Sequence, residues 1–93
     1  MASLRRVKKD IDYLVSEVVY DCYLALHSER RDAIVAVMEE AVDTRNEFYE
    51  MANHPAEKHN KSLVKKHYAF LRNELMERID GLFDKLSKVV NEK

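Results

Sequence analysis

Histidine and cysteine side chains are the groups in this sequence with the most evident capacity for chemistry. Three of the four histidines, His54, His59 and His67, lie close together, and neutral imidazoles so placed could bind a divalent transition metal. Their spacing matches no recognised ligand pattern. On one straight helix His59 and His67 would stand about two turns, or ~12 Å, apart, which is too far to share an ion. The pattern therefore favours solvated or core-edge histidines over a metal site.

Enzyme motifs are missing from the sequence. It contains no Gly-rich phosphate loop, no nucleophile elbow and no His-Glu-x-x-His motif, and its one glycine, Gly81, could not build the first two. The one cysteine, Cys22, falls on an apolar stripe, where a thiol normally packs as a small hydrophobic group with a raised pKa. We therefore predict a protein that is not an enzyme and that carries no cofactor.

The scarcity of turn-forming residues predicts few, long elements. Gly81 and Pro55 are the only glycine and proline in 93 residues, whereas β and α/β domains need turn residues at most connections. The composition, 46% hydrophobic and 35% charged, can supply one core, and the length is below that at which chains usually divide. We predict an all-α fold, an antiparallel three-helix bundle in up-down-up order, as a single domain over residues 1–93.

Apolar periodicity sets the expected boundaries of the first two helices. The first helix is predicted from about Ser3, a plausible N-cap, to about Leu26. Its apolar stripe, at steps of three and four, consists of Leu4, Val7, Ile11, Leu14, Val18, Cys22 and Ala25. The second helix is expected to run from a cap at Ser28 to about Ala52.

A proline separates the second helix from the third. Pro55 disfavours helix in the residue before it, so Pro55 to Lys61 is expected to form a loop or a separate short turn. The third helix then continues to about Val90, and its stripe passes Gly81 without a change of phase. A β-strand is the alternative for residues 13–26, but no other segment could pair with it.

The second half of the first helix carries more apolar residues than one stripe needs. Those lying off the stripe are Tyr13, Val15, Val19, Tyr20, Tyr23, Leu24 and Leu26. Of these, Tyr13, Tyr20 and Leu24 follow one line along the helix, and tyrosine is favoured at protein interfaces. We predict that this line is the self-association face of a homodimer. The alternatives are that it packs beneath the Pro55–Lys61 segment or belongs to a wide core.

Basic residues are expected to gather at one end of the bundle, where the first and third helices begin. They are Arg5, Arg6, Lys8, Lys9, Lys58, Lys61, Lys65 and Lys66. Cations at helix N-termini oppose the helix dipole, so helix stability does not explain them. They could bind the phosphates of a nucleic acid or another polyanion, more strongly as the nearby histidines become protonated at lower pH. The alternative is an ordinary solvated network, in which the neutralising carboxylates are Asp10, Asp12, Glu47, Glu50 and Glu57.

Other polar residues suggest structural ion pairs. Thr44 and Arg45 interrupt the apolar side of the second helix, and Arg45 could reach a carboxylate such as Glu17 or Asp21 across the bundle. The alternative is an arginine that binds a ligand. On the exposed side of the third helix two four-residue pairs are expected, Glu74 with Arg78 and Asp84 with Lys88.

The overall charge and hydropathy limit the classes of partner to expect. The formal net charge is −1, so the whole molecule creates no strong field for nucleic acid or membrane, and no apolar run approaches the ~20 residues of a membrane span. The N-terminal residues lack the apolar core of a signal peptide, and one cysteine fits a reducing compartment. We expect a cytoplasmic interaction module whose partner is protein, with polyanion binding as the alternative.

Overall fold

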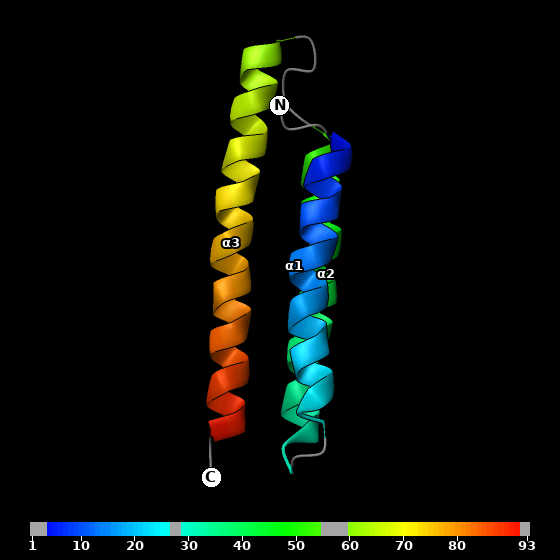
Figure 1. Cartoon of the computed structure of the whole chain (residues 1–93), viewed down its shortest axis with the longest axis vertical. Helices are drawn as coiled ribbons and strands as arrows, with labels where there is room; N and C mark the ends of the chain where they lie inside the picture. Colours follow the sequence, from blue (N-terminus) through cyan, green and yellow to red (C-terminus); the bar gives the residue numbers. More distant parts are fainter. Residues whose placement is uncertain (1–3, 27–28, 55–59, 92–93) are drawn as a thin grey trace.

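The protein folds into a bundle of long α-helices. The structure, a computed structural model, describes residues 4–26, 29–54 and 60–91, and within them contains α1 (Leu4–Leu24), α2 (Arg31–Asn53) and α3 (Lys61–Asn91). α1 and α3 run in the same direction, and α2, which lies behind α1 in Figure 1, runs in the opposite direction. This is the predicted antiparallel, up-down-up three-helix bundle, and the described residues contain no β-strand.

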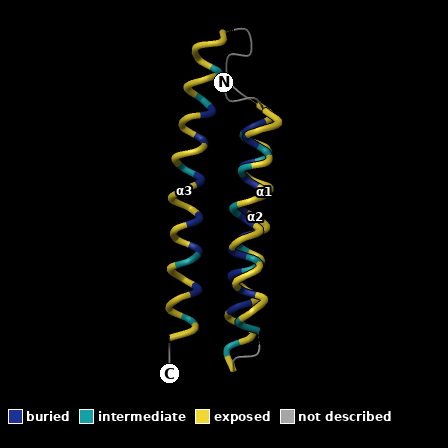
Figure 2. Tube along the Cα trace, in the orientation of Figure 1, coloured by how far each residue is buried: buried dark blue, intermediate teal, exposed yellow. Residues whose placement is uncertain are grey.

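One narrow stripe of each helix forms the core. In α1 the buried residues are Val7, Ile11, Val15, Val18 and Cys22, at steps of three and four. In α2 they are Ile34, Val37, Ala41, Thr44, Phe48 and Ala52. In α3 they are Tyr68, Leu71, Leu75, Ile79, Leu82 and Leu86. Figure 2 shows these buried positions turned toward the neighbouring helices, with exposed residues on the outer sides. The bundle is 52 Å long and 18 by 16 Å across, so the core is a single thin column.

The stripe of α1 differs from the predicted one at its middle and at its start. Val15, predicted to lie off the stripe, is buried, whereas Leu14 is only half-buried and Leu4 is exposed. A helix with two neighbours buries a sector wide enough to include adjacent positions. Val15 lies on the side of α1 that faces α2, and Leu14 lies on the side that faces α3.

The helix ends depart from the predicted caps. α2 begins at Arg31, later than expected, and Arg30 at its N-cap makes no side-chain capping hydrogen bond. The predicted caps Ser3 and Ser28 lie outside the described residues. α3 has a side-chain cap that the sequence analysis missed. The Oδ1 atom of Asn60 accepts hydrogen bonds from the backbone N–H groups of Ser62 and Leu63, at 3.1 and 3.2 Å, as an N-cap asparagine does.

α3 continues as one helix through Gly81, as predicted. Gly81 is exposed, and a Cβ atom added to it would meet nothing within 4 Å. The glycine therefore serves no packing purpose in this helix and leaves it with a conformational entropy cost.

We predict that Gly81→Ala raises the free energy of unfolding by about 0.5–1 kcal/mol, because alanine has the higher helix propensity. Urea unfolding followed by far-ultraviolet circular dichroism measures the change. Ala69→Gly, at an exposed position of the same helix, is the reciprocal control and should lower stability by about 1 kcal/mol. A loss of stability in Gly81→Ala would contradict the open surroundings of Gly81.

Candidate interaction surfaces

The seam between α1 and α2 is polar in the half nearer the start of α1. Arg45 Nε donates to Asp12 Oδ1 at 2.9 Å, and the Tyr49 hydroxyl donates to Asp12 Oδ2 at 2.5 Å. The Arg45 guanidinium also lies over the Tyr49 ring, 4.2 Å from its centroid. The hydrogen bond from Tyr49, together with the hydrogen bond and the positive charge of Arg45, holds the pKa of Asp12 below its ordinary value against the opposing effect of partial burial.

Arg45 forms the expected ion pair with a carboxylate across the bundle, but not with Glu17 or Asp21, the two examples suggested by the sequence. Its partner is Asp12. The side chains of Glu17 and Asp21 leave α1 on its other side, whereas Asp12 lies toward α2, so the rotation of α1 about its axis decides the pairing.

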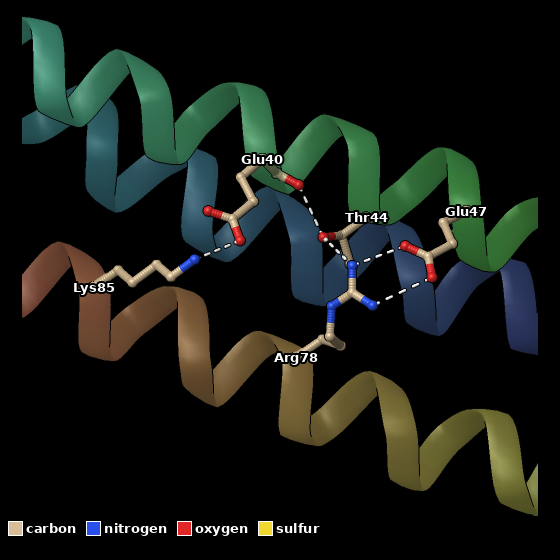
Figure 3. A network of polar contacts seen from close by, with 5 residues as sticks. All are labelled: Glu40, Thr44, Glu47, Arg78 and Lys85. Atoms are coloured by element: carbon tan, nitrogen blue, oxygen red, sulfur yellow. Dashed lines mark hydrogen bonds and ion pairs between the residues drawn. The ribbon is translucent and has the colours of Figure 1, made fainter.

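The seam between α2 and α3 carries a second polar group, drawn in Figure 3. Thr44 is fully buried, and its hydroxyl donates to the backbone oxygen of Glu40 at 2.8 Å, so it leaves no unsatisfied polar group in the core. Arg78 pairs with Glu47 through both carboxylate oxygens, at 2.8 and 3.3 Å. Lys85 lies 2.6 Å from the Glu40 carboxylate. Arg78 thus binds across the seam to Glu47 instead of along α3 to Glu74.

Of the two pairs predicted along α3, the second is present. Lys88 Nζ lies 3.2 Å from Asp84 Oδ2, both side chains largely exposed. Such a pair contributes little to stability, and we assign it no further role.

The outer side of α1 carries a line of exposed apolar residues. The structure places Tyr13, Tyr20 and Leu24 there, with 65%, 61% and 52% of each residue exposed. We call these three residues the α1 face. Of the other apolar residues expected off the stripe, Val15 is buried, Val19 and Leu26 pack partly against the core, and Tyr23 is exposed. The surplus apolar surface is therefore narrower than the sequence predicted.

The starts of α1 and α3 lie at the same end of the bundle, at the top of Figure 1. Arg72 Nη2 contacts Asp10 Oδ2 at 3.0 Å, and because the two helices are parallel, Arg5 stands near the level of Lys66. The exposed cations of this end that form no ion pair with a described residue are Arg5, Lys9, Lys61, Lys65 and Lys66. Lys8 instead lies 5.5 Å from the ring centroid of Tyr49. Lys58 lies outside the described residues.

The described carboxylates that were expected to neutralise this basic end contact other side chains. Asp10 pairs with Arg72 and Asp12 with Arg45, as described above. Glu47 pairs with Arg78, and Glu50 with the imidazole of His54 at 3.2 Å. Glu57 lies outside the described residues. The four described carboxylates are thus engaged away from the exposed lysines.

His67 and Cys22 contribute to the packing of the bundle. His67, half-buried as expected, donates from Nε2 to the backbone oxygen of Met51 at 2.9 Å, while His54 lies exposed beside Glu50. His59 lies outside the described residues, and within the described part of the chain no three metal-ligating side chains converge. Cys22 is fully buried, and that burial raises the pKa of its thiol.

Comparisons with protein-family models, curated proteins and solved structures find no match to this chain. Over the residues that the structure describes, none of the helices combines the length and the apolar character of a membrane span.

The lowered pKa of Asp12 predicts an acid-dependent loss of stability. A carboxyl whose pKa is lower in the folded state stabilises the fold above its unfolded-state pKa, and that contribution disappears as pH falls through the folded-state value. We expect Asp12→Asn to be less stable than wild type at neutral pH and the difference to vanish in strong acid. Urea unfolding at a series of pH values tests this.

Tyr49→Phe is the matched variant, because it removes the hydrogen bond that contributes most to the lowered pKa. Carboxyl ¹³C titration by NMR should show the pKa of Asp12 moving back toward its ordinary value in Tyr49→Phe. An unchanged titration in this variant would show that the hydroxyl contact does not form in solution.

Proposed function

We propose that this protein is a non-enzymatic protein-interaction module that self-associates through the α1 face. The observation that carries the proposal is the exposure of Tyr13, Tyr20 and Leu24 on one line of a helix whose opposite side is already packed. Contiguous apolar surface exposed by a small bundle marks an interaction site, and tyrosine suits one because its ring packs while its hydroxyl stays hydrated. Symmetric dimers are the commonest homo-oligomers, which favours a second copy as the partner.

The charges around the α1 face favour an antiparallel two-fold arrangement. Lys9 precedes Tyr13 by one turn, and Glu17 and Asp21 follow it, all three exposed. If two copies of α1 pack antiparallel about an axis near Glu17, Lys9 of each copy comes near Asp21 of the other, and Tyr13 lies beside Tyr20. Parallel packing would instead oppose Lys9 to Lys9 and Asp21 to Asp21. Complementary charge selects the antiparallel register.

We predict that sedimentation equilibrium at micromolar concentration gives a mass near twice 11.0 kDa. Tyr20→Glu should shift the protein to monomer, because it replaces an aromatic ring of the α1 face with a carboxylate that would have to lose water on association. Phe70→Glu, at an exposed aromatic residue of α3, is the control and should leave the dimer intact. A strict monomer at high micromolar concentration would refute self-association.

A separate experiment tests whether the two copies of α1 pack antiparallel. Glu17→Cys, near the proposed axis, should form an intermolecular disulfide readily under oxidation. Leu24→Cys should not, because about fifteen residues of helix, or roughly 22 Å, would separate the two copies of position 24. The native Cys22 is buried in the core and does not compete in the folded protein. Efficient crosslinking at position 24 would point to parallel packing.

A second candidate function is polyanion binding at the basic end, favoured by one observation. The described carboxylates that could neutralise this end are paired elsewhere, which leaves Lys61, Lys65 and Lys66 exposed without an ion-pair partner among the described residues. Such a cluster would bind phosphates by counterion release, with strong salt dependence and without base specificity.

We predict that labelled RNA, DNA and heparin bind at low salt and dissociate at moderate salt. Changing Lys61, Lys65 and Lys66 together to glutamine should weaken binding and make the slope of log K against log salt shallower by roughly two to three. Lys88→Gln, at the far end of α3, is the control and should bind as wild type does. No binding at low salt, or binding indifferent to the triple change, would exclude this function.

A further inference from the structure

The α1–α2 seam changes character along its length. Near the start of α1 it is filled by Asp12, Arg45 and Tyr49, as described above. Beyond them, toward the end of α1, it opens into a groove whose lining is almost entirely apolar. The residues that line this groove are Val19, Leu26, Val35, Met38, Glu39, Val42 and Asp43. We call it the α1–α2 groove.

The apolar lining forms two ridges. One consists of Val19 on α1 and Leu26 in the turn that follows α1, and the other consists of Val35 and Val42, about two turns or ~10 Å apart on α2. Met38 lies partly buried between the ridges, packed against the core. Two such ridges leave a channel of the kind that accepts the apolar stripe of an incoming helix.

The rim of the groove carries negative charge without a counter-charge. Glu39 and Asp43 line the groove, and neither forms an ion pair with another described residue. Other carboxylates of α2 are engaged: Glu40 binds Lys85 and Glu47 binds Arg78. Carboxylates beside a surface that loses water on binding require cations from the partner, because an unpaired charge there is costly.

We propose that the α1–α2 groove binds an amphipathic helix of another protein whose apolar stripe is flanked by lysine or arginine. The groove supplies the apolar contact, and Glu39 and Asp43 select basic over acidic segments. The site is separate from the α1 face, since Tyr13, Tyr20 and Leu24 do not line it. The proposal therefore stands independently of self-association.

The test uses two fluorescent peptides of about four helical turns and the full-length protein. Both carry leucines at helical spacing; one has lysines on the flanks and the other has glutamates at the same places. Fluorescence anisotropy should show micromolar binding of the lysine peptide and at least about tenfold weaker binding of the glutamate peptide. Amide chemical-shift changes should centre on Val19, Val35 and Val42.

Two sets of variants make the result specific to the groove. Val42→Gln should weaken the lysine peptide about tenfold, whereas Val90→Gln should not, although these valines are similarly exposed at 48% and 50%. The double variant Glu39→Lys, Asp43→Lys should reverse the preference between the two peptides. Circular dichroism confirms that each variant remains helical.

Several outcomes would overturn the proposal. If Val42→Gln binds the lysine peptide as tightly as wild type does, the peptide binds elsewhere on the protein. If both peptides bind equally tightly, Glu39 and Asp43 do not select the partner. If Val42→Gln converts a dimer to a monomer, the groove is a contact between copies of this chain and not a site for another protein. If Tyr20→Glu but not Val42→Gln converts the dimer to a monomer, and the lysine peptide binds as expected, the α1 face and the α1–α2 groove both act as proposed.

Discussion

Each helix of this protein depends on the burial of one stripe of its surface against the other two. In a protein, most of the stability of a helix comes from the tertiary packing of its apolar face. Here that packing is a single column of side chains such as Val18, Ile34 and Ile79, each almost completely buried. The described part of the bundle has only this one column of buried side chains. Rotation of any helix about its own axis would expose part of the column, so the buried stripes determine which residues of each helix face outward.

The polar seams depend on that fixed rotation. Asp12, Arg45 and Tyr49 meet only because α1 and α2 each present one flank to the other. Arg78 meets Glu47 for the same reason across α2 and α3, and its guanidinium also lies 5.7 Å from the centroid of the buried Phe48 ring. These side chains are partly exposed, so their net contribution to stability is small. Their effect is to favour one axial offset between neighbouring helices and to close the α1–α2 seam at one end.

A thin bundle has a large surface for its volume, and three parts of that surface differ in chemistry. The α1 face is aromatic and aliphatic, the start of α3 is basic, and the α1–α2 groove is apolar with an acidic rim. Each faces outward because the core column uses only the inner positions of each helix. The two proposed contacts, a second copy on the α1 face and a basic helix in the α1–α2 groove, use different residues.

The sequence by itself determined the helices, their order and most of the core, because a period of 3.6 residues is a local property and Pro55 marks a break that needs no tertiary information. It also predicted that α3 continues through Gly81. The Asn60 cap could have been found from the sequence, since asparagine directly precedes the third helix. Only the tertiary structure decided that Val15 is buried more deeply than Leu14, that Arg45 pairs with Asp12, and that an apolar groove opens beyond Tyr49. These features depend on how far each helix is rotated about its axis and shifted along it, and all three helices set those two quantities together when they pack around one core.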